Sequence, residues 1–220
     1  MAAGSNVRAI GVRARRESSS DKHDAILDAA ARIFMSQGFA GTSLDDVSDA
    51  YGATKGIIYY HFRSKSALFF AVQRRAMELT REAIEPHAAM AGTAAARLKA
   101  MAHAHSLLMM RRLPYLRVAG QGLELHLSGR TTREERTELD AITALRDANE
   151  RLYIDVIADG VRAGEFRSVD PRLMVKPLLG ALNWTSRWYQ PRPGETPADQ
   201  EALAEQLALF ALNALLARSA

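Results

Sequence analysis

The sequence has no cysteine, which excludes disulfide frameworks, thiolate zinc sites and cysteine nucleophiles. It has no apolar run of membrane-spanning length, and its first twenty residues, rich in Arg and Ser, lack the hydrophobic stretch of a secretory signal. No Gly-rich phosphate loop, HExxH or GxSxG pattern occurs. We therefore expect a cytoplasmic protein that is not an enzyme and that needs no cofactor and no metal.

Positive charge is distributed unevenly along the chain. Residues 1–75 hold 11 Lys and Arg against 7 Asp and Glu, whereas residues 76–220 hold 18 of each. The whole net charge of +4 therefore lies in the first third. Such asymmetry indicates a polyanionic partner that one part of the molecule contacts, although a solvated basic tail would give the same count.

Helical patterns dominate the chain, and no segment shows convincing strand alternation. Residues 1–20 contain few large apolar residues and are predicted to form a flexible basic arm. Apolar residues then recur at three- and four-residue spacings up to Gly38, which is placed to end a first amphipathic helix. The sequence thus predicts an all-α fold.

A short helix with a capped start follows. Ser43 as N-cap and Asp46 three residues later form a capping-box pattern, so Asp45 and Asp46 are assigned to helix capping rather than to acid–base catalysis or metal binding. Gly52 interrupts this helix, and Thr54 is placed to open another that runs through residue 62. Two short helices joined at a glycine predict a helix-turn-helix.

The second of these helices has an unusual composition. Ile58 and Phe62 can pack inward, which leaves Lys55, Tyr59 and His61 near the opposite side. Gly56 keeps the first turn slim, so that the backbone can approach a neighbour closely. A slim helix that is rich in hydrogen-bond donors and free of carboxylates suits the major groove of DNA and its phosphates.

The segment GTSLDDVSDAYGATKGIIYYHFRSKSALFFAV resembles the DNA-binding signature of TetR-family transcriptional regulators. The similarity covers roughly residues 22–72 and lies in the Gly-Thr opening, the turn glycine, Lys-Gly-x-x-Tyr-x-His-Phe and the following Ser-Lys. It implies a homodimer that inserts helix 54–62 into successive major grooves of operator DNA. Ile57 departs from the family, which often has Thr or Ser there, and could contact a thymine methyl group instead. The DNA-contacting residues that the resemblance implies are Thr42, Ser43, Thr54, Lys55, Gly56, Ile57, Tyr59, Tyr60, His61 and Lys65.

The rest of the chain predicts further helices, including a long one over 133–162 and a last pair over 171–190 and 198–218. The final helix is apolar around most of its circumference, so we expect the last two helices to pack against the same helices of a second copy of the chain. Burial within one larger core would also explain the pattern. The predicted division is an arm (1–20), a helix-turn-helix domain (21–67) and a ligand-binding and dimerisation domain (68–220).

Residues 146–194 are similar to a TetR branch that responds to acyl-CoA thioesters in fatty-acid and steroid catabolism. The Gly-Glu-Phe turn and the Asn-Trp…Arg-Trp-Tyr element carry this similarity. It implies a small hydrophobic effector, of which an acyl-CoA is one kind, held in an apolar tunnel with basic groups for phosphates. Ordinary core or interface packing is the competing interpretation for every tunnel candidate. The candidates are His105, Leu108, Met109, Leu113, Tyr115, Arg187 and Trp188.

Together these features predict a ligand-responsive repressor released from its operator by that effector. Two alternatives remain open from the sequence. One is an enzyme of thioester metabolism whose basic end is incidental. The other is a non-specific, nucleoid-type DNA-binding protein.

Overall fold

The computed structural model of the chain describes residues 19–52, 54–127 and 132–217. Within these ranges the regular structure is helical, with one isolated antiparallel bridge between Phe166 and Leu216. The all-α prediction is confirmed. The predicted basic arm falls outside the described residues, except for Ser19 and Ser20, which begin α1. The helices are α1 (Ser19–Gly41), α2 (Leu44–Tyr51), α3 (Lys55–His61), α4 (Lys65–Ala88), α5 (Ala94–Arg111), α6 (Leu113–Leu127), α7 (Arg133–Arg162), α8 (Pro171–Trp188) and α9 (Pro197–Asn213).

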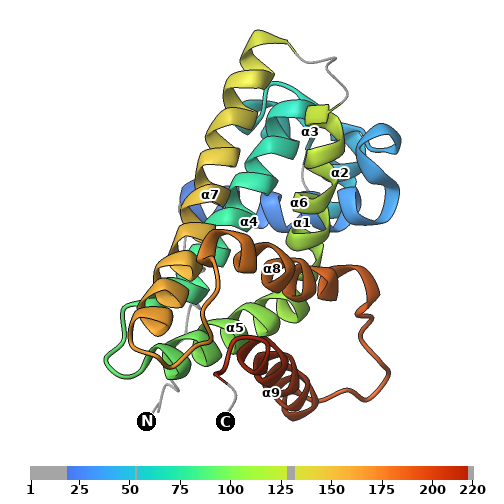
Figure 1. Ribbon diagram of the computed structural model, residues 1–220. Coiled ribbons are helices and arrows are strands. Elements are labelled where there is room, and N and C mark those ends of the chain that lie inside the picture. The colour runs from blue at the N-terminus through green and yellow to red at the C-terminus, as the bar shows by residue number, and fades with distance from the viewer. Residues whose placement is uncertain (1–18, 53, 128–131, 218–220) are drawn as a thin grey trace, which may run out of the picture.

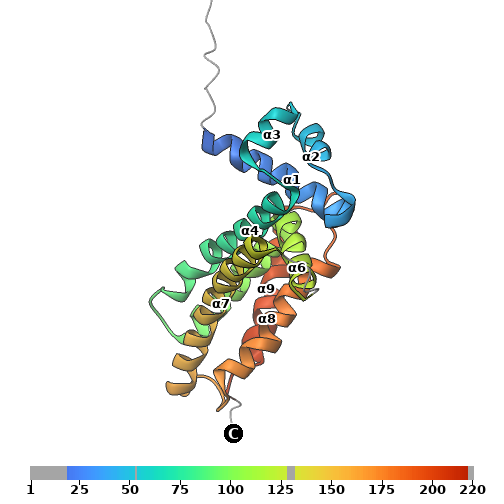
Figure 2. The ribbon, with the colours of Figure 1, turned by 90° about the horizontal axis from the view of Figure 1, so that it is seen from above.

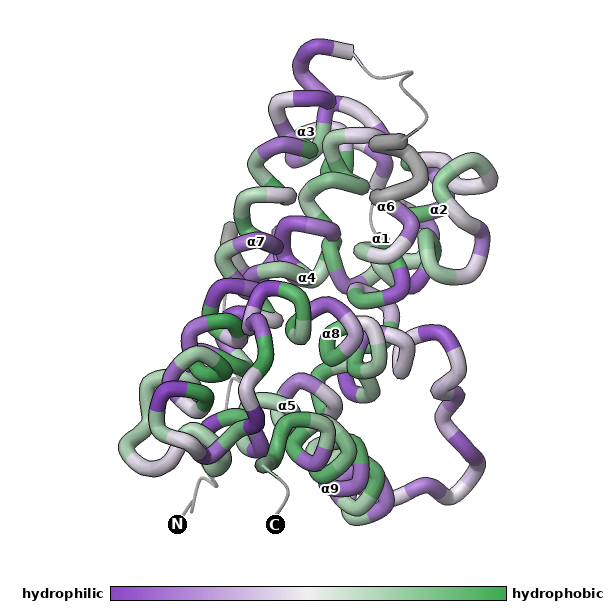
Figure 3. Tube along the Cα trace, in the orientation of Figure 1, coloured by the Kyte–Doolittle hydropathy of each residue, from purple (hydrophilic) through white to green (hydrophobic). Residues whose placement is uncertain are grey.

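The helices form two groups that α4 connects. Figure 2 shows α1, α2 and α3 gathered at one end, while α4 runs from them into the bundle of α4 to α9. In Figure 1, α6 and α7 stand on either side of α4, and α8 crosses below them. Helix α5 packs against α4, α7, α8 and α9, which makes it the central helix. Figure 3 shows hydrophobic residues recurring along α5 and α9 and a hydrophilic segment between α8 and α9.

The start and the end of α2 follow the local signals in the sequence. The Ser43 hydroxyl accepts the Asp46 N–H at 3.1 Å, and the Asp46 carboxylate accepts the Ser43 N–H at 2.7 Å. Hydrogen bonding to Ser43 lowers the pKa of Asp46 below its usual value. At the other end Gly52 has a φ of 75°, a left-handed conformation that favours glycine. The capping assignment of Asp46 is confirmed.

One hydrophobic core joins the N-terminal helices to the bundle. Ile58 of α3 is fully buried with Val47 of α2 and Phe34 of α1. The same cluster continues through Phe69 of α4 to Leu116 of α6. Because this core crosses from α3 to α6 without interruption, a shift within the bundle has a packed route to α3.

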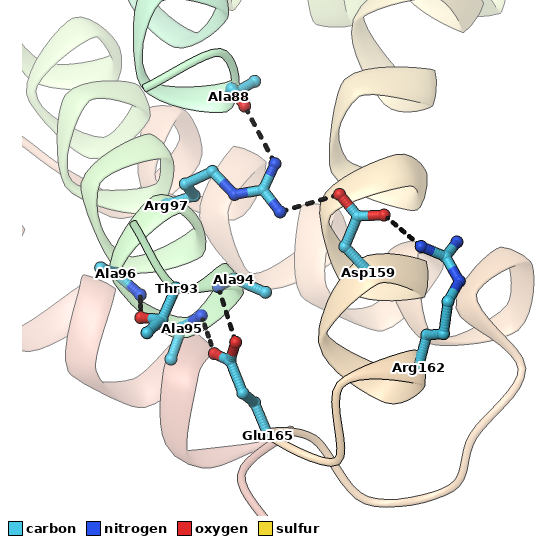
Figure 4. Close-up of polar contacts among 9 residues, drawn as sticks. All are labelled: Ala88, Thr93, Ala94, Ala95, Ala96, Arg97, Asp159, Arg162 and Glu165. Carbon is cyan, nitrogen blue, oxygen red and sulfur yellow. Dashed lines mark hydrogen bonds and ion pairs between the residues drawn. The ribbon is translucent and has the colours of Figure 1, made fainter. Parts of the chain in front are cut away.

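The Gly-Glu-Phe turn closes the opposite end of the bundle (Figure 4). Gly164 has a φ of 74°, which lets the chain reverse after α7. The Glu165 carboxylate accepts the N–H groups of Ala94 and Ala95, at 3.1 and 2.8 Å, and so caps the start of α5. The Phe166 ring lies against Gly160, where a Cβ atom would be only 2.2 Å from it. The three residues of the turn therefore hold α5 and α7 together.

A small ionic cluster reinforces this end. Asp159 on α7 accepts hydrogen bonds from Arg97 on α5, at 2.8 Å, and from Arg162, at 3.0 Å. These two guanidinium groups, Arg97 first, lower the pKa of Asp159 below its usual value. Arg97 also donates to the Ala88 carbonyl at the end of α4. The cluster thus ties the ends of three helices.

Three predicted helix ends were wrong. Helix α3 stops at His61, not at residue 62, because Phe62 has an extended conformation. Helix α8 stops at Trp188, not at residue 190, because Tyr189 turns into an extended conformation and is buried with its hydroxyl donating to Glu195. Helix α9 stops at Asn213, not at residue 218. The Leu215 carbonyl instead accepts the Arg167 N–H at 2.9 Å, so the chain leaves the helix to lie along the Gly-Glu-Phe turn.

Candidate nucleic-acid interface and ligand cavity

Helix α3 turns one face inward and presents the other to solvent. Ile58 and Phe62 anchor it, with exposed fractions of 0% and 6%. Tyr59 is 53% exposed, Tyr60 83% and Ile57 36%. These three side chains form a surface that nothing in the described part of the chain covers.

Gly56 on the first turn of α3 stands beside this surface. A Cβ atom built on it would meet nothing within 4 Å. Packing inside the chain therefore does not require glycine here. A missing side chain on an exposed helix turn does allow an external backbone to come close.

Lys55 is held by a neighbour in the free protein. Its ammonium group donates to the Asp45 carboxylate on α2, and this contact raises the pKa of Lys55 above its usual value. The side chain is 62% exposed, so the pair lies at the surface, where exposed ion pairs contribute little to stability. Asp45, assigned to capping with Asp46, instead holds the lysine that the resemblance places at DNA.

The remaining predicted DNA contacts differ in their exposure and in whether their side chains are already hydrogen-bonded within the chain. Thr54 is exposed and makes no capping hydrogen bond with its side chain, so its hydroxyl is available. His61 is half-buried, with its ring centroid 5.2 Å from that of Tyr60. Ser43 is exposed, but its hydroxyl is engaged with Asp46.

Two predicted contacts are turned inward. The Thr42 side chain is buried and donates to the Gly38 carbonyl at 2.8 Å. The Lys65 ammonium donates to the carbonyls of Phe39 and Ala40, at 2.8 and 3.4 Å, and lies 4.6 Å from the centre of the Phe39 ring. Here Lys65 fastens the start of α4 to the end of α1, and a phosphate contact by its side chain stays a prediction.

The helical part of the N-terminal third carries little net charge. Residues 19–75 contain 7 Lys and Arg against 6 Asp and Glu, so most of the excess lies in residues 1–18, outside the described part. The groups that the exposed face of α3 offers for hydrogen bonding are mainly hydroxyl, imidazole and backbone groups, and few of them are positively charged. Such groups position a protein on DNA through phosphate contacts.

The bundle encloses a cavity of about 470 Å³ between α4, α5, α6, α7 and α8. This volume is within the range of small-molecule binding sites. The apolar part of its wall is made by Met77, Ile84, Met109, Leu116 and Leu179. The cavity therefore offers an apolar ligand a site inside the helical bundle.

The structure brings three of the seven predicted effector residues to this cavity: His105, Met109 and Arg187. The other four do not line it. Leu108 packs against the core that α1 shares, and Leu113 is buried in a separate cluster with Tyr189. Trp188 is 45% exposed on the outside of α8.

Tyr115 was expected in the tunnel but has another position. Its hydroxyl donates to the Asp28 carboxylate of α1 at 2.8 Å. Burial, and then this hydrogen bond, raise the pKa of Tyr115. Since α6 also lines the cavity through Leu116, Ala119 and Gly120, the Tyr115 hydrogen bond connects a cavity wall to the N-terminal helices.

Polar side chains lie on the buried wall of the cavity, which sequence reasoning missed except for His105. The His105 Nδ1 atom is 3.0 Å from the Tyr153 hydroxyl, and both side chains are buried. Burial lowers the pKa of His105 to about 4, so the imidazole is neutral. Asn149, one helical turn before Tyr153, donates to the Met77 carbonyl at 2.9 Å.

Cationic side chains lie at the solvent-exposed edge of the cavity. Arg146, Lys176 and Arg187 line it and are all exposed. Lys176 donates to Glu150 at 2.6 Å, and the Arg146 Nε atom lies 3.7 Å from the neighbouring Asp147 carboxylate. Arg187 forms no ion pair within the described part of the chain. These side chains give the edge of the cavity a positive character.

The polar residues of α7 carried a spacing signal in the sequence. Arg146, Asn149, Glu150 and Tyr153 repeat at helical intervals along one face. The long helix was predicted, but this polar face toward a cavity was not.

Other site types find no support in the described residues. No group of three or more His, Asp or Glu side chains there could hold a metal ion. In the same residues, no helix combines the length and the apolar character needed to cross a membrane.

Comparison with known proteins decides the family. Residues 26–72 match the model for bacterial regulatory proteins of the tetR family, and residues 91–215 match that for the tetracyclin repressor-like C-terminal domain. The chain belongs to the TetR family. It is thus a transcriptional regulator, and the alternative of a thioester enzyme is rejected.

Relatives and solved structures extend over most of this TetR-family chain. The transcriptional repressor KstR2 of Mycolicibacterium smegmatis is 22% identical over 206 residues, 89% of this chain and 91% of the relative. PfmR from Thermus thermophilus is similar in structure with a TM-score of 0.73 and 28% identity, covering 86% of this chain and 97% of PfmR. AibR in complex with isovaleryl coenzyme A and operator DNA has a TM-score of 0.68 and 26% identity, covering 89% and 98%.

Proposed function

We propose that this protein is a repressor that binds operator DNA through α3 and leaves it when a small hydrophobic effector enters the cavity. The observation that carries the proposal is the exposed α3 face beside Gly56, formed within a TetR-family fold that encloses a cavity. In this proposal residues 21–67 contact DNA, and residues 68–220 bind the effector and a second copy.

Six of the predicted DNA contacts have surroundings that suit a role at the duplex. Gly56 and Thr54 bring the α3 backbone and a free hydroxyl to the major groove, and Ile57 contacts a thymine methyl group. Tyr59 and Tyr60 reach phosphates on either side. Lys55 exchanges Asp45 for a phosphate when DNA binds.

A second copy of the chain is the proposed partner of α8 and α9. The buried seam of α9 consists of Ala204, Ala208 and Ala211, which lets it pack closely on α5, while Leu209 and Phe210 face outward. Large apolar groups so exposed on adjacent helices mark an interface, and a dimer would place two α3 helices for two half-sites. The exposed apolar residues are Leu173, Trp184, Trp188, Leu209, Phe210 and Leu216.

The proposed effector is an acyl-CoA thioester. The apolar wall suits an acyl chain, and Arg146 and Arg187 at the exposed edge suit the phosphates of the CoA part. Support comes from AibR, whose structure holds isovaleryl coenzyme A. The acyl group would lie inside while the nucleotide end stays outside.

Helices α4 and α6 provide the proposed connection between the two sites. Helix α4 lines the cavity through Met77, Thr80 and Ile84 and begins at Lys65, which is fastened to α1. Helix α6 reaches α1 through the Tyr115–Asp28 hydrogen bond. An effector that displaces these helices separates the two α3 helices, and half-sites about 34 Å apart then no longer fit both.

The test starts from a pool of randomised duplexes, because the operator is not known. Selection with the purified protein, followed by sequencing, should enrich one palindromic sequence. Fluorescence anisotropy then compares that duplex with a scrambled one at physiological salt, where the expected preference is about 10³-fold or more. Adding acyl-CoAs of several chain lengths should release the selected duplex. Equal binding to both duplexes would favour the non-specific, nucleoid-type alternative.

A further inference from the structure

The buried wall of the cavity contains hydrogen-bonding capacity that the described part of the chain does not use. The His105 side chain is 3% exposed and the Asn149 side chain 6%. Neither His105 Nε2 nor Asn149 Oδ1 has a hydrogen-bonding partner among the described residues. Both residues line the cavity, on α5 and α7, and Tyr153, which His105 contacts through Nδ1, follows Asn149 by one helical turn. Unpaired polar atoms this deeply buried are uncommon and call for a specific explanation.

The orientation of Asn149 is fixed by its other hydrogen bond. Its Nδ2 donates to the Met77 carbonyl at 2.9 Å, and since a carbonyl can only accept, the amide nitrogen must face it. The unpaired atom is therefore the carbonyl oxygen. This atom requires a donor from whatever occupies the cavity.

The His105 ring supplies the complementary group. The Tyr153 hydroxyl has no other hydrogen-bond acceptor among the described residues, so we assign it as the donor to Nδ1. The neutral ring then carries its proton on Nε2, and that N–H is a donor. The Asn183 amide lies beside the ring, yet Nε2 makes no hydrogen bond of ordinary geometry with it. The cavity wall thus presents one unpaired acceptor and one unpaired donor.

We propose that the effector carries a neutral hydroxyl group on its buried end, which donates to Asn149 Oδ1 and accepts from His105 Nε2–H. This inference rests on the proposed function and narrows its ligand class to hydroxylated acyl groups. A plain hydrocarbon chain leaves both atoms unpaired. A carbonyl group pairs with His105 alone.

A carboxylate does not fit the same place. The lowered pKa of His105 keeps the imidazole uncharged at neutral pH, and the Asn149 oxygen faces an anion with its negative end. The cationic side chains of the cavity, Arg146, Lys176 and Arg187, are at the exposed edge instead. The edge of the cavity is therefore suited to bind charged groups of a ligand, and the buried wall is suited to bind a neutral polar group.

The test compares ligands that differ only in this group. Octanoyl-CoA and 8-hydroxyoctanoyl-CoA, with shorter pairs of the same design, are titrated by calorimetry into the wild-type protein. The expected result is a preference of about 10-fold or more for the hydroxylated member of at least one pair, because a site built to bond a hydroxyl rejects the analogue that lacks it. Equal affinity within every pair overturns the inference and leaves the acyl-CoA proposal standing.

Variants assign the preference to the two side chains. Asn149→Leu and His105→Phe should remove it, while the cavity control Met109→Leu should keep it. Thermal unfolding of each variant checks that it folds. If His105→Phe does not fold, Asn149→Leu alone decides: a preference that survives in it overturns the inference.

A second pair separates this inference from the thioester proposal. If no CoA thioester binds, cyclohexanol and methylcyclohexane are added to protein with labelled histidine, and the His105 ring resonances are followed by NMR. A shift of the Nε2 signal by the alcohol alone supports the hydroxyl site without the CoA. No shift, or the same shift with both compounds, overturns it.

Discussion

Acid should destabilise this protein through one buried histidine. His105 has a pKa of about 4 in the folded chain, against 6.5 for an unperturbed histidine, because burial disfavours the charged ring. Between these values the unfolded chain binds a proton that the folded chain does not. The contribution of His105 to stability is therefore complete above pH 6.5 and is lost as the pH falls toward 4.

The expected loss follows from the two pKa values. Integrated from neutral pH down to pH 4.5, it is about 2.5 kcal/mol. The carboxylates whose pKa values are lowered, such as Asp46 and Asp159, lose their contribution only below this window. A loss of this size is a substantial part of the stability of an ordinary domain.

The assay is urea unfolding at pH 7 and pH 4.5, at one fixed protein concentration because a dimer is expected. Wild type is compared with His105→Gln, which stays neutral at both pH values. His87→Gln removes a half-exposed histidine as the matched control. Between pH 7 and pH 4.5 the free energy of unfolding of wild type and of the control should fall by about 2 kcal/mol or more beyond the fall in His105→Gln. An equal loss in all three proteins would show that His105 does not cause the acid sensitivity.

Two further predictions concern the closed end of the bundle and the connection to α1. Gly160→Ala places a Cβ atom 2.2 Å from the Phe166 ring, so the free energy of unfolding should fall by about 1–3 kcal/mol. Gly180→Ala meets nothing within 4 Å in the described chain, so it should leave the free energy of unfolding unchanged or raise it by up to about 1 kcal/mol. Urea unfolding of both variants checks this, and equal losses would contradict it. Tyr115→Phe removes the hydrogen bond to Asp28 outside the cavity. The affinity of DNA-free protein for the effector should then stay within about twofold, and the effector-induced change in DNA affinity should shrink several-fold, since a hydrogen bond to a charged group contributes about 1.5–3 kcal/mol. Calorimetry measures the effector affinity, and anisotropy measures the DNA affinity with and without effector. An unchanged ratio of the two DNA affinities would count against this route.

Features set by neighbouring residues could be predicted from the sequence. The start of α2 depends on Ser43 and Asp46, and that of α9 on Thr196 and Asp199, and both capping boxes form as the local pattern indicates. Helix α2 ends before Gly52 and α7 ends before Gly164, and both ends follow from the conformational freedom of glycine. Interactions over three or four residues leave few alternatives to such signals.

Contacts between distant residues could not be predicted in this way. His105 and Tyr153 meet although 48 residues separate them, and Lys65 turns to a carbonyl 26 residues away. Tyr115 looked suited to a tunnel, but the rotation of α6 places its hydroxyl at Asp28. Which face of a helix meets a cavity depends on how all its neighbours pack, and periodicity alone does not contain that information.

In the proposed function α3 reads DNA with its backbone close to the duplex at Gly56. Anisotropy on the selected duplex should compare wild type with Gly56→Ala, with Asp155→Ala, a change at an exposed residue of α7, as the control. Because a Cβ at residue 56 meets nothing in the chain, the variant should be as stable as wild type or up to about 1 kcal/mol more stable. We predict that Gly56→Ala nevertheless loses about 10-fold or more in DNA affinity while Asp155→Ala keeps it. An unchanged affinity in Gly56→Ala would contradict the account.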